Sequence, residues 1–476
     1  MHSDVLIVGA GSAGSVLAER LSADPSCRVT VVEAGPGPSD PRALNQISDG
    51  LRLPIGTTSS VVRRYPTTLT DAPERHAQIM RGAVVGGSGA VNGGYFCRGL
   101  PADFDGWGLP DWTWSKVLPH FRAVETDLDF DGGPLHGADG PIPVQRVSEF
   151  RGCTAEFVDA VTDAGFEWVP DLNGSTPEVP VPPGFGRVPL NIRGGTRVGP
   201  GDAYLRPAMH RPNLALLTGT RARQVQIDNG RASGVACVGP DGPVDLSADR
   251  IVLAAGAIAS AHLLMLSGVG PQAHLRDFGI AVTADLPVGA ATVDHPEWLL
   301  PVTWSQASGQ PPLEVVLTTP DDIEMRPFTA GFGAMISGRR DGPADHPHIG
   351  VALMRPQSRG SVRLVSADPD VLPAVRHHYD SEPADIAMLR TGALLARDLA
   401  GAAAAASVSW STSQHLCRTA PMGRDDDEEA VVDPRCRVRG IDGLWVVDGS
   451  VLPNIPSRGP HATIVMIGHR AAEFVA

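Results

Sequence analysis

The sequence begins with an apolar run, a glycine-rich turn and an amphipathic segment in direct succession. Residues 4–8 have the length and β-branched content of a buried parallel strand. Residues 9–14, GAGSAG, follow at once and match G-x-G-x-x-G. Apolar residues then recur at helical spacing through residue 22, and residues 28–32 predict a second strand that leads into Glu33. This order predicts a β-α-β unit.

The glycines of this turn have separate physical roles. Gly9 permits the tight turn, Gly11 lets the backbone approach a pyrophosphate, and Gly14 allows close packing of helix on strand. The helix N-terminus favours phosphate charge, and an acid after the second strand can accept hydrogen bonds from a ribose hydroxyl. A purely structural glycine turn is the alternative, but the order of the elements favours binding. The sequence predicts dinucleotide contacts from Gly9, Gly11, Ser12, Ala13, Gly14, Glu33 and Ala34.

The composition is that of a globular chain with more than one domain. The 476 residues exceed one ordinary core, and 42% hydrophobic with 19% charged residues excludes a disordered protein. A net charge of −14 argues against nucleic acid or an anionic membrane as the main partner. Neither a signal peptide nor a run apolar enough for a membrane helix is present, which predicts a cytoplasmic protein without an integral membrane segment.

The cysteines give no sign of a metal site. All six are scattered, without a C-x-x-C pair or a Cys/His cluster at ligand spacing. This pattern predicts a reduced compartment and no bound metal.

A second glycine-rich stretch occupies residues 81–95, after residues 35–75, which we expect to be irregular loops. So many glycines would destabilise the interior of a helix or strand. They are suited to backbone that lies against a flat ligand and offers it N–H donors; an ordinary glycine-rich loop is the alternative.

Residues 81–95 resemble the first signature of the glucose–methanol–choline (GMC) oxidoreductases, FAD enzymes that act on alcohols. Residues 256–270 resemble the second signature, with Ala261 in place of a proline. The resemblance continues through residues 294–296, 359–364 and the C-terminus, and so covers nearly the whole chain in order. It implies a Rossmann-like FAD-binding domain and a smaller α+β substrate-binding domain built on an antiparallel sheet.

The resemblance also implies a division of the chain and a set of FAD contacts. The FAD-binding domain comprises residues 1–150, 195–296 and 406–476, and the substrate-binding domain residues 151–194 and 297–405, with strands near 313–317 and 361–364. Val91 stands where some relatives join FAD through a histidine, which implies non-covalent FAD. The further implied contacts are Gly82, Gly86, Gly87, Ser88, Asn92, Gly93, Ala222, Ala255, Gly256, Asp448, Gly449, Ala462 and Thr463.

Two histidines match the catalytic positions of the family. Alcohol oxidation needs a base for the hydroxyl proton and a hydride acceptor, and a neutral imidazole suits the first task. The match implies His415 as the base and His461 as its partner, with the two roles open to exchange. Arg418 replaces a family glycine, so a cation is expected to lower the pKa of His415 or to bind an acidic substrate. The acidic run 425–429 is interpreted as a solvated loop.

The implied reaction is oxidation of a CH–OH group to a carbonyl. Residues 92–99 look most like an actinobacterial branch associated with the peptide-derived redox cofactor mycofactocin, which implies a mycofactocinol dehydrogenase. Its electrons would pass to a respiratory chain or quinone rather than oxygen, at the inner face of the cell membrane. The alternatives are a small-alcohol or choline-type dehydrogenase or oxidase, a redox-silent lyase and an electron-relay flavoprotein.

Overall fold

The computed structural model describes residues 2–339, 342 and 344–476. Its larger sheet has seven strands in the order β10-β2-β1-β13-β12-β11, with β23 beside β13. Strands β10, β2, β1, β13 and β23 are parallel, whereas β12 and β11 extend the sheet antiparallel. These strands are β1 (His2–Val8), β2 (Val29–Val32), β10 (Leu214–Leu217), β11 (Arg221–Asp228), β12 (Arg231–Gly239), β13 (Gly242–Leu253) and β23 (Leu444–Val446).

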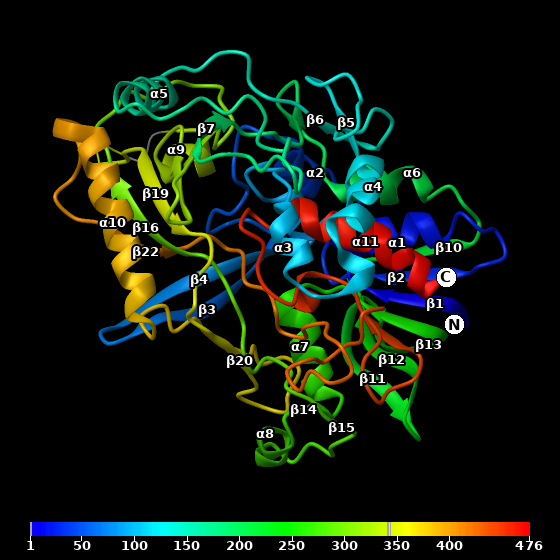
Figure 1. The fold of residues 1–476 in the computed structure, drawn as a ribbon. Coiled ribbons are helices and arrows are strands. Elements are labelled where there is room, and N and C mark those ends of the chain that lie inside the picture. Colours follow the sequence, from blue (N-terminus) through cyan, green and yellow to red (C-terminus); the bar gives the residue numbers. More distant parts are fainter. Residues whose placement is uncertain (1, 340–341, 343) are drawn as a thin grey trace.

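The predicted β-α-β unit is confirmed, and its helix is covered by the C-terminal helix. Helix α1 (Ser12–Leu21) follows the glycine turn, and α11 (His461–Val475) crosses it in front of the sheet (Figure 1). A Cβ at Gly468 would lie 2.8 Å from the Cα of Ala13, so the crossing requires glycine in α11. This close crossing places the N-terminal turns of both helices at the same end of the parallel strands.

A second sheet forms the other part of the molecule. It has six strands in the order β22-β16-β19-β18-β17-β7, all antiparallel, and α10 (Pro383–Ala400) and α5 (Cys153–Asp163) lie beside it (Figure 1). The α/β fold with a second, antiparallel sheet is therefore confirmed. The strands are β7 (Gly184–Arg187), β16 (Pro296–Pro301), β17 (Val315–Thr318), β18 (Ile323–Pro327), β19 (His348–Leu353) and β22 (Ser409–Thr412).

The prediction of irregular loops over residues 35–75 is wrong. This stretch contains α2 (Pro41–Ser48) and β3 (Val62–Asp71), and β3 pairs with β4 (Glu74–Gly82). Strand β21 (Ala374–Arg376) lies on the other side of β3 and pairs with β20 (Ser361–Arg363). The expected strand near residues 361–364 therefore belongs to this third sheet, because its partners come from the N-terminal part of the chain.

The remaining elements are short and surround these sheets. No described helix is long and apolar enough to span a membrane. These elements are η1 (Gly87–Ala90), α3 (Pro101–Asp105), η2 (Pro110–Trp112), α4 (Trp114–Val124), β5 (Glu125–Asp127), β6 (Ile142–Val144), β8 (Ile192–Arg193), β9 (Thr196–Arg197), η3 (Gly201–Leu205), α6 (Arg206–Ala208), α7 (Ala257–Leu266), β14 (Val269–Gly270), α8 (Gln272–Asp277), β15 (Ala284–Asp285), α9 (Phe332–Ser337), η4 (Gly401–Ala403) and η5 (Gly449–Val451).

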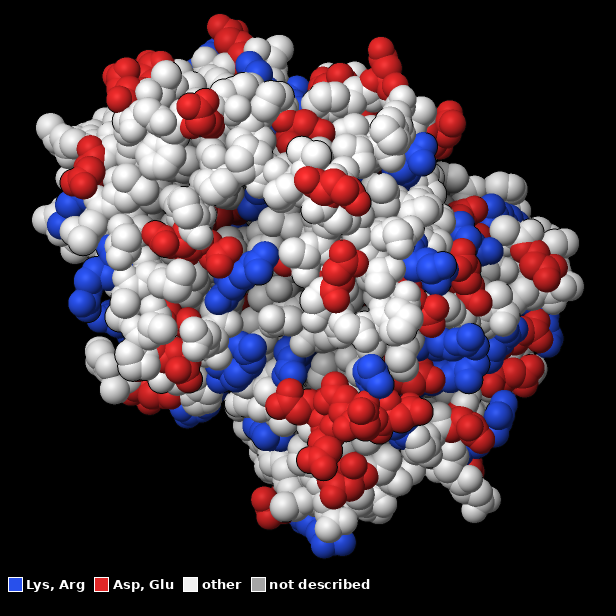
Figure 2. Space-filling model, in the orientation of Figure 1, with Lys and Arg blue, Asp and Glu red and all other residues white. Residues whose placement is uncertain are grey.

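Charged side chains of both signs are mixed on the face of the molecule that Figure 2 shows. On the face in Figure 2, Lys and Arg alternate with Asp and Glu, and acidic side chains gather at the lower centre, where Figure 1 shows orange chain. Residues 425–429 are all exposed, as a solvated loop requires.

Candidate active site

The two glycine-rich stretches meet at the ends of the parallel strands. The amide of Gly86 donates to the carbonyl of Ala10 at 2.8 Å, and a Cβ at Gly87 would lie 2.7 Å from the Cα of Gly11. Gly9 and Gly14 approach backbone even more closely, since a Cβ at Gly14 would lie 2.0 Å from the carbonyl oxygen of Gly9. These glycines let the two stretches approach backbone to backbone, and we call the resulting arrangement of residues 9–14 and 82–93 the glycine cradle.

The predicted contacts Glu33 and Asp448 have protein partners at the rim of this cradle. The Glu33 carboxylate accepts from the amides of Ala10 (3.0 Å) and Gly35 (2.8 Å). The Asp448 carboxylate accepts from the Gly256 amide (2.8 Å), the Ser260 hydroxyl (2.6 Å) and the Ser450 amide (2.8 Å). Burial raises the pKa of both carboxyls, and these hydrogen bonds oppose the rise. Each oxygen has two lone pairs, so Glu33 retains acceptor capacity toward a hydroxyl.

The helix N-termini beside the cradle fit an anionic or hydrogen-bonding ligand. Helices α1 and α11 both begin without a side-chain cap, so their first N–H groups have no partner within the helix. In α11, Nε2 of His461 and Oγ1 of Thr463 are buried without a partner among the described residues. Uncapped amides, orphaned donors and a glycine cradle are what a dinucleotide requires, so the residues present fit FAD.

The other predicted FAD residues lie along the same edge. The Ser88 hydroxyl accepts a hydrogen bond from the Gly82 amide at 3.1 Å. A Cβ at Gly93 would lie 3.7 Å from the Cβ of Pro312, which precedes β17 of the second sheet. Ala255 and Gly256 connect β13 to α7, and Gly449 begins η5. Ala222 lies in β11, shortly after Thr220, whose amide donates to the carbonyl of Glu33 at 2.9 Å.

His415 follows β22 and faces His295, a residue for which the sequence predicted no role. Their Nδ1 atoms lie 2.9 Å apart, and the His415 amide donates to Asp294 at 2.8 Å. Nε2 of His415 has no hydrogen-bond partner among the described residues, and the side chain is partly exposed. Burial, then His295, Arg326 and Arg81, hold the pKa of His415 well below its usual value. The ring is therefore neutral at neutral pH, with Nε2 free.

His461 has a different partner, Asn92. The Asn92 side-chain oxygen accepts from the Gly94 amide at 3.0 Å, so its nitrogen faces Nδ1 of His461, also at 3.0 Å. An amide nitrogen only donates, so Nδ1 accepts and the proton of the neutral ring lies on Nε2. Burial and Arg197 lower the pKa of His461 to about 4. No hydrogen bond joins His415 and His461, and the Nε2 atom of each ring has no hydrogen-bond partner among the described residues.

Arg418 does not act on His415 as the sequence suggested. Its guanidinium donates to the carbonyls of Pro453 (2.7 Å) and Ala291 (2.8 Å) and pairs with Glu429. Burial and His295 lower the pKa of His415 most, and the cations that contribute are Arg326 and Arg81 rather than Arg418. Arg418 has φ +63°, a left-handed conformation that glycine adopts more readily than other residues.

A buried polar network beside His415 was missed by the sequence analysis. The Tyr95 hydroxyl donates to Glu324 at 2.9 Å, and Glu324 also pairs with Arg326 at 2.7 Å and Arg458 at 3.6 Å. Arg326 donates to Ser413, two residues before His415, at 2.8 Å and lies 3.5 Å from Glu297. Strand pairing of β16 and β18 with β19 brings Glu297 near Arg326, and loop residues such as Tyr95 and Arg458 complete the network, so no local sequence signal marks it.

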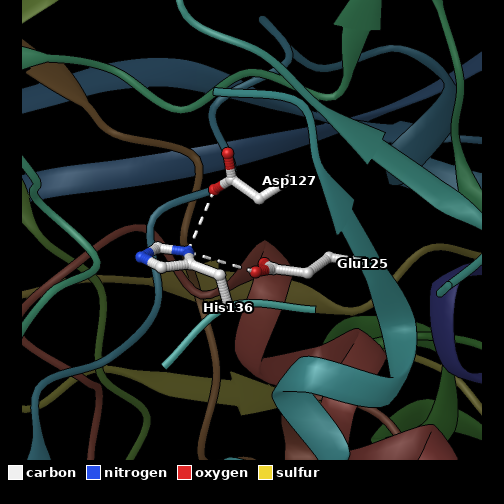
Figure 3. A group of neighbouring side chains, drawn as sticks. All are labelled: Glu125, Asp127 and His136. Carbon is white, nitrogen blue, oxygen red and sulfur yellow. Dashed lines mark ion pairs between the residues drawn. The ribbon is translucent and has the colours of Figure 1, made fainter. Parts of the chain in front are cut away.

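One group of described side chains has the residue types of a metal site, but it already contains its cations. Glu125, Asp127 and His136 offer ligand atoms within 4.8 Å of one another, and Figure 3 shows one nitrogen of the His136 ring, Nδ1, facing both carboxylates. Arg98 pairs with Glu125, and Arg146 pairs with Asp127 at 2.9 Å. Both carboxylates are therefore already paired with guanidiniums and with the protonated His136 imidazole, which leaves no unpaired carboxylate for a metal ion.

This cluster predicts a pH dependence of stability. Burial lowers the pKa of His136, but hydrogen bonds to Asp127, Asp171 and Glu125 outweigh it and raise the pKa to about 10. The stabilisation is complete below the unfolded value of 6.5 and is lost as the pH rises through 10. We expect His136→Gln to lower the free energy of unfolding by about 3–5 kcal/mol at pH 6. In urea titrations the difference in unfolding free energy between the variant and wild type should shrink toward pH 10. The control is His76→Gln, which replaces an exposed histidine. A difference that does not change with pH would contradict the assignment of a raised pKa to His136.

Comparison with known proteins identifies the family. Sequence models of the GMC oxidoreductase family match residues 3–297 and 356–468. An "uncharacterized GMC-type oxidoreductase in thcA 5'region" of Rhodococcus erythropolis is 40% identical, covering 100% of this chain and 98% of the relative. An oxygen-dependent choline dehydrogenase of Rhizobium etli is 33% identical, covering 100% and 96%. The solved pyridoxine 4-oxidase of "Mesorbium loti" superposes with a TM-score of 0.86 at 28% identity, covering 99% and 98%.

The chain belongs to the GMC oxidoreductase family. It is an FAD-dependent oxidoreductase acting on CH–OH donors.

Proposed function

We propose that His415 is the base and His461 its hydrogen-bonding partner in the oxidation of a CH–OH group. The observation that carries this assignment is the free Nε2 of a neutral His415 beside a cradle that fits FAD. Nε2 of His415 takes the hydroxyl proton, and the Nε2–H of His461 holds the oxygen that loses it. Bound FAD supplies the hydride acceptor. This arrangement favours oxidation over the alternatives of a redox-silent lyase and an electron relay.

The proposed cofactor is FAD held without a covalent bond. The cradle from Gly9 to Gly14 and from Gly82 to Gly93 holds the pyrophosphate and ribityl chain, and Glu33 holds the adenosine ribose. Val91, which has no nucleophilic atom, supports non-covalent binding. Acid precipitation of purified protein is expected to release essentially all flavin into the supernatant; flavin that stays with the pellet contradicts this proposal.

The substrate we propose is the reduced form of mycofactocin, with a quinone or other respiratory acceptor for the electrons. The buried network disfavours choline, because Glu297 and Glu324 face Arg326 and Arg458 and offer no unpaired carboxylate to a quaternary ammonium. Nε of Arg458 is buried without a partner among the described residues, which favours an oxygen-rich substrate. We place the reaction in the cytoplasm, at the inner face of the cell membrane.

An anaerobic titration of the FAD-loaded protein tests the substrate. Choline, pyridoxine, simple alcohols and reduced mycofactocin are added separately, and the loss of oxidised-flavin absorbance is recorded before air is admitted. The proposal predicts bleaching by reduced mycofactocin alone and slow recovery in air. Bleaching by choline or simple alcohols with rapid recovery would instead make the protein an alcohol oxidase.

A further inference from the structure

We propose that His295 is a positioning residue that sets the tautomer of His415, an inference that rests on the proposed function of the same site. The contact between the two Nδ1 atoms, 2.9 Å, needs exactly one proton between them when both rings are neutral. If His295 donates, the proton of His415 lies on Nε2, and His415 is no base. If His415 donates, its Nε2 is a free acceptor facing the substrate.

The surroundings of His295 favour the second arrangement. Its side chain is fully buried at the start of β16, and the backbone carbonyls of Pro456 and Met354 act on the ring in the sense that raises its pKa. Carbonyl oxygens only accept, so both favour a proton on the His295 ring. Nδ1 is the nitrogen that faces His415, and Nε2 is buried without a partner among the described residues, so we assign this proton to Nε2. With its proton on Nε2, His295 accepts at Nδ1. The burial of the ring and Arg326 keep it neutral, because both lower its pKa.

Hydrogen bonds made by residues 294 and 295 hold the imidazole rings of His295 and His415 in position relative to each other. The carbonyl of His295 accepts from the Ser413 amide at 3.3 Å, and Asp294 binds the Thr412 hydroxyl at 2.6 Å and the His415 amide at 2.8 Å. Residues 294 and 295 therefore brace the segment after β22 at four points, counting the imidazole pair. Gln414 within this segment has φ +64°, so the turn that aims His415 depends on such bracing.

A pair of variants separates positioning from packing. His295→Asn can retain an acceptor near the position of Nδ1, whereas His295→Leu retains bulk without one. In FAD-loaded protein, His295→Leu is expected to slow flavin reduction at saturating substrate by about ten-fold to ten-thousand-fold with little change in KM. His295→Asn should recover most of the rate. In a His415→Ala background, His295→Leu should add no further loss.

Nitrogen-15 NMR of histidine-labelled, FAD-loaded wild-type protein reads the tautomer without turnover. The inference predicts a proton on Nδ1 of His415 and on Nε2 of His295. A proton on Nε2 of His415, an unchanged rate in His295→Leu, or a full additional loss in the His415→Ala background would each overturn it. If no alcohol or reduced mycofactocin reduces the wild-type flavin, the proposed function fails, and the NMR result still decides the tautomer.

Discussion

His415→Ala is expected to slow reduction of the bound flavin by substrate about a hundred-fold to ten-thousand-fold, while FAD stays bound. The variant removes Nε2, the free acceptor that we assign to the hydroxyl proton. Stopped-flow absorbance under anaerobic conditions measures the rate constant, and the ratio of flavin to protein absorbance measures FAD content.

The control for this variant is His76→Ala, which removes an imidazole that is exposed at the surface beside Glu74. It should reduce its flavin at the wild-type rate. A His415→Ala protein that keeps FAD and the wild-type rate would show that another group takes the proton.

Gly11→Ala is expected to weaken FAD binding by more than about ten-fold and to leave the stability of the apoprotein nearly unchanged. Gly11 has φ −75°, which alanine adopts freely, and the nearest protein atom to a Cβ there lies 3.6 Å away. The added methyl group makes only ordinary van der Waals contacts in the protein alone, but it occupies the approach that we assign to the pyrophosphate. Isothermal titration of apoprotein with FAD and thermal unfolding without FAD separate the two effects.

Substitutions at two other glycines serve as controls for Gly11→Ala. Gly14→Ala should prevent folding, because its Cβ would lie 2.0 Å from the Gly9 carbonyl oxygen, whereas Gly133→Ala meets nothing within 4 Å and should behave as wild type. Wild-type FAD affinity in a folded Gly11→Ala protein would place the pyrophosphate elsewhere.

The helices and strands that the sequence predicts well are those whose pattern lies within one short stretch of the chain. The strand, turn and helix at the N-terminus carry their signals within residues 4–33, and α10 has an apolar face of its own. Strand β3 lacks such a signal, since it contains Pro66 and several charges, and it forms through pairing with β4 and the distant β21. Long-range pairing of this kind leaves little trace in a local pattern.

The candidate active site could likewise be predicted from the sequence only in part. The resemblance marked His415 and residues 294–296 separately, but their contact exists because β16 pairs with β22 and aligns Pro296 with Thr412. The wrong expectation for Arg418 has a related cause, since a cation next to a histidine in sequence need not face it. The fold class and the glycine-rich cradle were therefore predictable, whereas the partners of the two histidines that we propose as catalytic were not.

The most direct test of CH–OH oxidation compares carbonyl formation with flavin reduction in one anaerobic turnover. FAD-loaded protein is mixed with the substrate that bleaches it, the loss of oxidised-flavin absorbance is measured, and the organic product is quantified from the same sample. Our account predicts one carbonyl formed for each flavin reduced. Product formation with the flavin oxidised throughout would indicate a lyase and contradict the account.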